Sequence, residues 1–331
     1  MQYCRGFPPA AKPELCKNDA TMTFVLGIDG GGSKSAAAVS DGVSVLATHV
    51  AGGCNLNSVS VECARVALGE AVRGALSSAG ISASDVSSVC AGVAGAASPE
   101  IAARITRLLA ELLPQSAIQV VGDTVIALEA AFAGGPGLVC IAGTGSVAFG
   151  RNERGEFARA GGWGRFVSDE GSGHWIGQRA VSQCLRALDM GRSSNLISGL
   201  MEHWSIATRE QLVQRSHEDQ IPSFAELFPV VLAVAETGDP LACEILSAAG
   251  FELARIAQVV LRRLWIGPSI VQVAYTGSVF SRSARIRQIF SNFIRADRPE
   301  VQVRISSREA FEGALYLAQQ ASVGMQARAL S

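Results

Sequence analysis

Short apolar runs alternate with longer amphipathic stretches along this sequence, and most of the runs end at a glycine. Residues 23–29 predict a buried strand, and residues 35–39 and 43–50 predict a hairpin that is broken at Asp41-Gly42. The rest of the first half predicts, in order, a helix at 61–79 that ends at Gly80, a strand at 86–91, a helix at 101–113, a strand at 118–121 and a helix at 126–132.

The second half repeats this plan after a glycine- and proline-rich junction at 134–137. It predicts a strand at 138–142, a turn at 152–155, a glycine-rich loop at 161–173, mainly helix to about 264, strands at 270–274 and 301–305, and a helix at 310–320. Such alternation indicates an α/β fold. We expect two domains, 23–134 and 135–309, with a last helix (310–331) that packs back on the first domain, and a disordered tail at 1–22.

The composition fits a two-domain protein with a large core. The 331 residues are 48% hydrophobic and 17% charged, which argues against global disorder. A net charge of −1 without a basic stripe gives no electrostatic basis for binding nucleic acid. No apolar run reaches the ~18 residues of a membrane span, and no secretory pattern is visible, so we expect a cytoplasmic protein. The eight cysteines include no CxxC pair and are expected to be free thiols.

The first candidate site is the run DGGGSK, which follows the first predicted strand. Glycines let backbone N–H groups approach a phosphate closely, although the spacing is not that of a Walker A loop. Asp29, at the strand end, is suited to hold Mg²⁺ through water. The alternative is a plain hairpin turn. The residues assigned to the phosphates are Gly31, Gly32, Ser33 and Lys34.

Asp123 follows the strand at 118–121 and is the candidate catalytic base. A carboxylate at this position is able to accept the proton of an attacking hydroxyl group. The alternative is that Asp123 caps the helix that follows it.

Three further glycine-rich segments follow predicted strands. Thr144 and Gly145 form a second candidate phosphate loop, and Gly277 and Ser278 lie in a third turn suited to adenine or ribose. Each is equally a simple turn. The loop at 161–177 combines tryptophans with acids, which suits the apolar faces and hydroxyl groups of a sugar. His174 lies where a helix begins, and we interpret it as structural.

The order of these motifs resembles one known family. GIDGGGSKS, AGVAG, GDTVIALEAA, GTGS, GGWGRFVSDEGSGHWIG and TGSVF are similar to the N-acetylglucosamine kinase branch of the BadF/BadG/BcrA/BcrD ATPase family, over about residues 24–318. That family belongs to the actin-like, hexokinase-like ATPase superfamily. The resemblance implies two ribonuclease-H-like domains around a central cleft that binds Mg·ATP.

The resemblance also implies residue roles. Asp123 takes the place of the base that acts on the sugar 6-hydroxyl, while Ala225 and Gly277 match positions near the nucleotide. Asp29, Ser33 and Thr144 match the phosphate loops. The positions that match sugar contacts are Asn55, Gly162, Trp163, Gly164 and Asp169.

Two departures and several alternatives remain. The family often carries a proline before Gly313-Ala314, which this chain lacks, and Cys54 beside Asn55 leaves the pocket near the N-acetyl group undefined. The substrate is expected to be N-acetylglucosamine, with glucosamine or a muramyl sugar as alternatives. An ATPase activator of a radical dehydratase and a sugar-sensing repressor are less consistent, because suitable cysteine pairs and a basic DNA-binding segment are missing. The oligomeric state is open, with a homodimer as one option.

Overall fold

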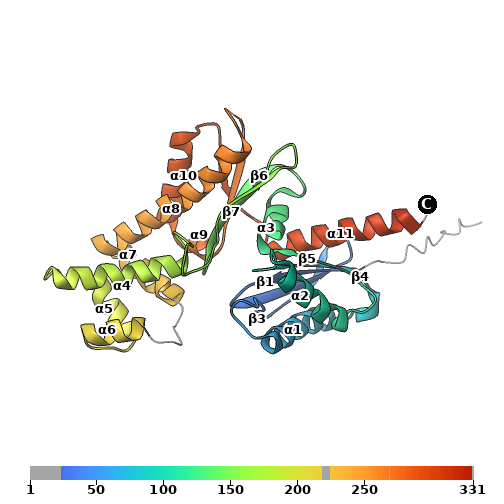
Figure 1. The fold of residues 1–331 in the computed structure, drawn as a ribbon, viewed down its shortest axis with the longest axis horizontal. Helices are drawn as coiled ribbons and strands as arrows, with labels where there is room; N and C mark the ends of the chain where they lie inside the picture. The colour runs from blue at the N-terminus through green and yellow to red at the C-terminus, as the bar shows by residue number, and fades with distance from the viewer. Residues whose placement is uncertain (1–23, 218–223, 268, 330–331) are drawn as a thin grey trace, which may run out of the picture.

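The chain folds around two separate five-stranded sheets. The computed structural model describes residues 24–217, 224–267 and 269–329, with side chains up to residue 323. Figure 1 shows a first lobe, made of β1–β5 with α1, α2 and α11, and a second lobe, made of β6–β10 with α4–α10. The predicted tail at 1–22 lies outside the described residues.

The first sheet has the strand order β3-β2-β1-β4-β5. Its first three strands form an antiparallel meander, whereas β4 and β5 run parallel to β1. The elements of this region are β1 (Phe24–Gly30), β2 (Lys34–Ser40), β3 (Val45–Gly52), α1 (Val61–Ala79), β4 (Val86–Val93), α2 (Pro99–Leu112), β5 (Ala117–Gly122) and α3 (Asp123–Phe132).

The second sheet, in the order β10-β9-β6-β7-β8, repeats this plan. Strands β6, β7 and β8 form the meander, and β9 and β10 are parallel to β6. Its elements are β6 (Gly137–Ala142), β7 (Ser146–Arg151), β8 (Phe157–Gly161), α4 (Gly173–Asp189), α5 (Asn195–His203), α6 (Arg209–Ser216), α7 (Phe228–Glu236), α8 (Pro240–Leu264), β9 (Gln272–Thr276), α9 (Ser278–Arg282), α10 (Ala284–Asp297), β10 (Gln302–Ile305) and, returning to the first sheet, α11 (Ala310–Ala329).

Local sequence explains where the helices begin and end. The Ser60 hydroxyl accepts a hydrogen bond from the backbone of Cys63 at the start of α1, and Gly80 ends that helix with φ 67°. Asp239 caps α8 by accepting from the N–H groups of Leu241 and Ala242. Helix α1 matches its predicted range of 61–79 because capping residues and glycine carry strong local signals, whereas no start was predicted for α8.

Helix α11 packs its backbone directly against the first sheet and α3. A Cβ atom on Gly27 of β1 would lie 2.6 Å from the carbonyl oxygen of Phe311, and a Cβ on Gly313 would lie 1.9 Å from that of Ile126. At the start of α11, the Glu312 carboxylate accepts a hydrogen bond from the N–H of Glu309 (3.0 Å). The helix therefore packs closely without the proline that the family often carries.

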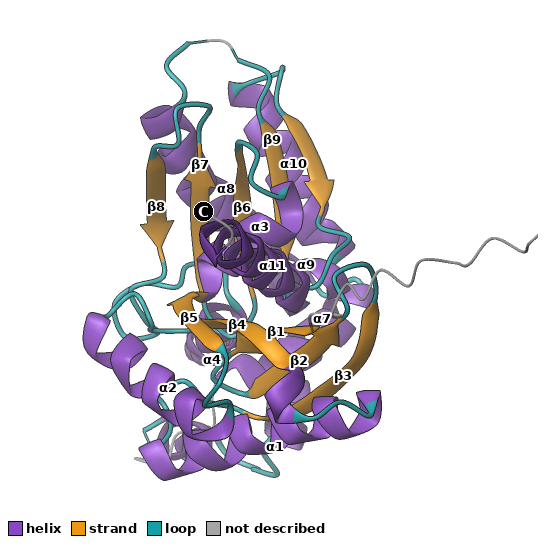
Figure 2. Ribbon diagram, turned by 90° about the vertical axis from the view of Figure 1, so that its right-hand side faces the viewer, coloured by secondary structure: helices purple, strands orange, loops and turns teal. Residues whose placement is uncertain are grey.

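Helix α3 lies between the two sheets. Ile126 packs with Val25 and Ala314 on the side of the first sheet and α11, whereas Leu128 packs with Val139 of the second sheet. Figure 2 shows α3 and α11 between the two sheets, with α1 and α2 on the far face of the first. Asp123, the first residue of α3, is thus placed where the lobes meet.

The predicted α/β fold is confirmed, and each sheet has the meander-then-parallel order of a ribonuclease-H-like fold. Two details of the prediction are wrong. The strand predicted at 270–274 is Gln272–Thr276, because Ile270 is exposed rather than buried. Strands β7 and β8 had no predicted ranges, only the turn at 152–155 between them, whereas the last helix ends at Ala329, close to the expected 331. None of the helices in the described ranges is long and apolar enough to cross a membrane.

Candidate active site

The carboxyl ends of β1, β4 and β5 lie side by side. Gly30 pairs with Val93, which pairs in turn with Gly122. Asp29 immediately precedes this row and Asp123 immediately follows it. Because ligands of α/β proteins bind beyond the carboxyl ends of strands, both carboxylates are at the edge of the sheet where a substrate is expected.

Asp29 lies in a negatively charged environment. Burial, together with the negative charges of Asp123 and Glu309, raises its pKa to about 6, and the positive charge of Lys34 acts in the opposite direction. Two neighbouring carboxylates, one of them partly buried, attract a cation. Such a cation can also bind the phosphate oxygens of a nucleotide. A magnesium ion held there would need water and phosphate oxygens as its other ligands, because no group of three or more metal-ligating side chains occurs within the described part of the chain.

Asp123 is the first residue of α3, and Gly122 occupies the N-cap position. Its carboxylate accepts a hydrogen bond from the N–H of the adjacent Thr124 (2.9 Å) and none is recorded from deeper in the helix. Burial raises the pKa of Asp123, while the Thr124 N–H and the positive charge of Arg159 lower it. The capping alternative therefore finds little support in the geometry, and most of the carboxylate's hydrogen-bonding capacity stays available.

The loop from Gly31 to Lys34 is held against the segment that contains Asn55. The N–H groups of Cys54 and Asn55 both donate to the carbonyl oxygen of Gly31, at 3.0 and 3.2 Å. A Cβ on Gly53 would lie 2.0 Å from the carbonyl oxygen of Gly32, so the two segments touch through their backbones. The candidate phosphate loop and the candidate sugar segment are thereby coupled.

Asn55 lies beside the loop that follows β4. Its side-chain oxygen accepts a hydrogen bond from the N–H of Asn57 (3.0 Å), and a Cβ on Gly95 would lie 3.3 Å from the same oxygen. The Cys54 thiol is buried beneath it, and burial raises its pKa. Among the described residues, the NH2 group of Asn55 donates no hydrogen bond, so it is available as a donor.

The nucleotide residues predicted in the second lobe come together. The N–H of Gly173 donates to the carbonyl oxygen of Gly143 (2.8 Å), next to Thr144. A Cβ on Gly143 would lie 4.0 Å from the Ser278 hydroxyl, and a Cβ on Gly173 would lie 3.5 Å from the Cβ of Ala225. Segments far apart in the sequence thus approach one another closely, at positions where the side chains are small or absent.

Gly277 is a position where only glycine fits. Its φ is 102°, and a Cβ there would lie 2.2 Å from the carbonyl oxygen of Ala142. The turn into α9 therefore requires glycine for both conformation and space.

Asp169 connects the sugar loop to the second phosphate loop. Its carboxylate accepts from the N–H of Ser146 (3.4 Å), and a Cβ on Gly145 would lie 3.0 Å from it. The side chain is buried, with a pKa raised by that burial, and its φ of 66° is rare outside glycine. Such strain is common where a side chain must be aimed at a ligand.

The other predicted sugar residues differ in exposure. Trp163 is 68% exposed and lies with its ring 5.1 Å from the guanidinium carbon of Arg159. Gly162 packs against Arg159 and Val147, and Gly164 has open space around it at φ 96°. The structure thus brings Gly162 and Asp169 next to the second lobe's phosphate loop and leaves Trp163 on a projecting loop.

His174 is buried and packs edge-to-face on Phe224, with ring centroids 5.3 Å apart. Burial lowers its pKa, so the imidazole is neutral near pH 7. Among the residues that the structure describes, its Nδ1 has no hydrogen-bond partner. This environment agrees with a packing role.

Sequence analysis did not identify Arg159. Its guanidinium donates to the carbonyl oxygens of Gly161 and Gly162, and its charge lowers the pKa of both Asp123 and Asp169. Its positive charge therefore acts on carboxylates of both lobes. The one available signal was a basic residue two positions before the glycine pair of GGWG, which is weak without a fold.

Comparison with a family model matches residues 26–318 to the BadF/BadG/BcrA/BcrD ATPase family. This protein belongs to that family. The match spans both sheets, every glycine loop described above and the part of α11 that packs on the first sheet.

Curated members of the BadF/BadG/BcrA/BcrD ATPase family are similar over nearly their whole length. The chain is 30% identical to an N-acetylmuramic acid/N-acetylglucosamine kinase of Clostridium acetobutylicum, over 90% of this chain and 98% of the relative. It is 28% identical to an N-acetyl-D-glucosamine kinase of Dictyostelium discoideum, over 88% and 97%. A solved structure of an N-acetylglucosamine kinase candidate from Chromobacterium violaceum shares the fold, with TM-score 0.73, 24% identity and coverage of 90% and 99%.

Proposed function

We propose that this protein is an ATP-dependent kinase of amino sugars, with N-acetylglucosamine as its leading substrate and the 6-phosphate as its product. The observation that carries the proposal is the arrangement around Arg159. The positive charge of this β8 residue lowers the pKa of Asp123 at the carboxyl edge of the first sheet and that of Asp169 beside the glycine loop of the second. This supports a nucleotide site and a carboxylate base that lie near each other, and the kinase names of the two curated relatives agree with it.

In this proposal, Asp123 orients the sugar 6-hydroxyl by accepting its hydrogen bond and takes its proton late, as the bond to phosphorus forms. Phosphoryl transfer depends mainly on positioning and charge stabilisation, so a strong base is unnecessary. The Thr124 N–H and the positive charge of Arg159 lower the pKa of the carboxylate and so oppose the effect of burial, which raises it. Arg159 also places positive charge near the developing negative charge of the transferred group.

ATP is the phosphoryl donor of this family, and the small-residue loops fit its phosphates. We assign Gly31, Gly32, Ser33 and Lys34 of the first lobe to the phosphates, and Thr144, Gly145, Ala225, Gly277 and Ser278 of the second lobe to the nucleotide. Mg²⁺, when bound, neutralises phosphate charge, and Asp29 would hold it through water.

The sugar is proposed to lie between Asn55 and the loop at 161–169. Asn55 and Asp169 would bond hydroxyl or amide groups, and Gly162 and Gly164 would allow the backbone to approach the ring. Trp163 is exposed here, so it would reach the sugar when the two lobes approach each other. Leaving a buried sugar hydroxyl unpaired costs about 1–3 kcal/mol, which makes these contacts selective.

The boundaries of the functional units are part of the proposal. We propose domains at 23–134 and 135–309, with α11 belonging to the first, because α11 packs on β1, β4 and α3. Closure of these domains on the sugar would exclude water and limit wasteful hydrolysis of ATP. A cytoplasmic location, where ATP is available, and a homodimer remain proposals of the same kind.

The decisive experiment measures ADP release from the purified protein across a panel of N-acetylglucosamine, glucosamine, N-acetylmuramic acid and glucose. The highest kcat/KM is expected for N-acetylglucosamine. A preference for N-acetylmuramic acid would select the alternative that the Clostridium relative suggests. Release of ADP that no sugar stimulates would contradict the kinase proposal and favour an ATPase activator, whose iron–sulfur cluster would colour the protein.

A further inference from the structure

A second cavity lies at the end of the second sheet where β6 and β9 begin. Its volume is about 560 Å³, within the range of small-molecule sites, and Gly137 and Gln272 lie on its wall. The candidate nucleotide loops follow the other ends of the same strands, one strand length away, which is roughly 20 Å at about 3.3 Å per residue. The cavity is therefore separate from the candidate active site.

Both chain segments that pass between the two sheets line this cavity. Residues 133–137 lead from α3 into β6, and residues 306–309 lead from β10 into α11. Gly135 and Pro136 of the first segment, and Ser306 to Arg308 of the second, lie on the cavity wall. Any change in the relative position of the two lobes must bend these segments, because they connect the lobes covalently.

Among the described residues on its wall, the cavity carries more positive than negative charge. Arg304 and Arg308 line it, and neither has a carboxylate partner among the described residues. Arg304 is held in place by donating to the carbonyl oxygen of Ala131 (2.9 Å) and by lying 5.6 Å from the ring centroid of Phe132. Arginine forks and hydroxyl groups such as that of Ser307 are typical ligands of phosphate groups.

One acidic side chain, Glu153, is found among the described residues of the cavity wall. Its carboxylate accepts from the indole nitrogen of Trp265 at 3.1 and 3.2 Å, so part of its hydrogen-bonding capacity is used. Two guanidinium groups therefore face one carboxylate.

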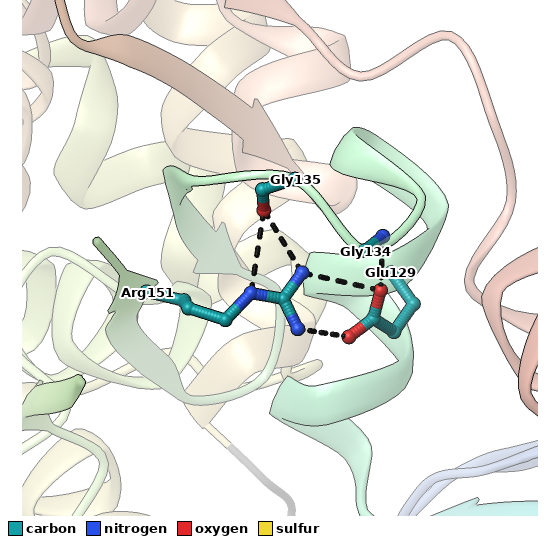
Figure 3. Close-up of polar contacts among 4 residues, drawn as sticks. All are labelled: Glu129, Gly134, Gly135 and Arg151. Carbon is teal, nitrogen blue, oxygen red and sulfur yellow. Dashed lines mark hydrogen bonds and ion pairs between the residues drawn. The ribbon is translucent and has the colours of Figure 1, made fainter. Parts of the chain in front are cut away.

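A buried ion pair connects the cavity wall to the helix that bears Asp123. Arg151 of β7 donates to both oxygens of Glu129 on α3, at 2.6 and 3.3 Å, and to the carbonyl oxygen of Gly135. Glu129 also accepts from the N–H of Gly134 (2.7 Å), as Figure 3 shows. These bonds hold the segment 133–137, α3 and β7 together. A ligand that contacts this segment therefore contacts a hydrogen-bonded unit that includes α3, the helix that begins at Asp123.

We propose that this cavity binds a small phosphate monoester of the size of a sugar phosphate, and that binding holds the two connecting segments in place and lowers kcat. The proposal rests on the proposed kinase function for its effect on turnover, whereas binding itself does not depend on that function. A phosphorylated amino sugar, which is the product class of the proposed reaction, and free inorganic phosphate share the required chemistry.

The test is calorimetric titration of the full chain, without nucleotide, using inorganic phosphate in one arm and N-acetylglucosamine 6-phosphate in the other. Arg304→Gln/Arg308→Gln is compared with Arg285→Gln/Arg295→Gln, a control that removes the same charge from two exposed arginines of α10. We expect the sugar phosphate to bind the wild type and the control equally, and the cavity variant at least 10-fold more weakly. Inorganic phosphate is expected to bind more weakly than the ester.

Ser307→Asp provides a second variant that leaves Arg304 and its contacts intact while placing a carboxylate in the cavity. It is expected to lose the sugar phosphate as well. Equal binding by the wild type and both cavity variants, or no binding by the wild type, would overturn the proposal.

Kinetics separate this proposal from the proposed function. The cavity variants are expected to keep the basal kcat, and added sugar phosphate should lower kcat of the wild type alone, without competing with the sugar. If the wild type is fully active and the sugar phosphate inhibits it only by competing with the sugar, the proposed regulatory role of the cavity is refuted. The kinase function is then unaffected. Inactivity on every sugar, with the ester still bound, would refute the kinase function and leave the cavity standing.

Discussion

Arg159 of β8 and Asp123 of α3 lie in different lobes, yet the positive charge of the guanidinium lowers the pKa of the carboxylate. Arg159 is fixed by hydrogen bonds to the carbonyl oxygens of Gly161 and Gly162. Burial acts in the opposite direction and raises the pKa of Asp123. The protonation state of Asp123, the proposed base, therefore depends on the position of Arg159 in the second lobe.

Replacing Arg159 with glutamine is expected to move the acidic limb of the kcat–pH profile to higher pH. The ionised carboxylate is the active form, so activity is present above the pKa of Asp123 and is lost as pH falls through it. Removing the positive charge raises that pKa further. Profiles of kcat between pH 4 and 9 are compared with those of Arg154→Gln, an exposed arginine in the β7–β8 turn. Superimposable profiles would show that Arg159 does not act on the base.

Gly313→Ala is expected to lower the free energy of unfolding by about 1–3 kcal/mol, the usual cost of overpacking. The added methyl group would lie 1.9 Å from the carbonyl oxygen of Ile126, a backbone atom that moves only if α11 and α3 separate. Gly69→Ala in α1 is the matched control, because the nearest atoms there belong to the flexible side chain of Arg73. That change should stabilise the protein by about 0.5–1 kcal/mol. Urea denaturation measures both, and equal midpoints would contradict the packing argument.

Local patterns were sufficient for most of the fold. Apolar runs that end at glycine predicted seven of the ten strands within about two residues of their observed positions, and Gly80 fixed the end of α1. Strands β7 and β8 were given no range of their own, only the turn at 152–155 between them. The strand near 270 was misplaced because Ile270 looks like a strand residue but is 73% exposed, whereas Val271 and Val273 are buried. The identity of one apolar residue does not show whether other parts of the chain bury its side chain.

The candidate site could be predicted where a residue follows a strand, as Asp29 and Asp123 do. Arg159 was missed because its environment depends on the pairing of β8 with β7 and on the contact of α3 with the second sheet, which are long-range relationships. Ala225 lies in a short 3₁₀ helix, and only the fold brings it next to Gly173. The resemblance to a family supplied Ala225, and nothing in its local sequence did.

Substitution of the two phosphate-loop glycines should separate their roles. Gly31→Val is expected to raise the KM for ATP alone, because a Cβ there approaches the backbone of Lys34 (3.0 Å). Gly145→Val should raise the KM for both ATP and the sugar, because its side chain would displace the carboxylate of Asp169. Gly52→Val at the end of β3 has room and serves as the control. Steady-state kinetics with each substrate varied would disprove the assignment if both variants kept a normal KM for ATP.

Asn55→Ala is expected to raise the KM for the sugar while leaving the KM for ATP nearly unchanged. The side chain accepts from the Asn57 N–H, so a purely structural role in this turn is the competing explanation. Asn55→Asp keeps that acceptor and removes the amide donor. A sugar KM that rises in both variants indicates a sugar contact, whereas normal kinetics in Asn55→Asp would restrict Asn55 to the turn.

Asp123→Asn tests the whole site. Asparagine has nearly the same shape and can hold the sugar hydroxyl, but it cannot take the proton. We expect KM for the sugar and ATP to change little while kcat falls by roughly 10²–10⁴, the usual range for losing a general base. The fold should be unaffected, because Gly122 rather than Asp123 occupies the N-cap position and the contact with the Thr124 N–H can be kept. Circular dichroism verifies the fold, and Asp41→Asn in the exposed β2–β3 turn is the control for an Asp-to-Asn change. Turnover close to that of the wild type would remove Asp123 from the chemistry, and the proposed kinase mechanism would then need a different base.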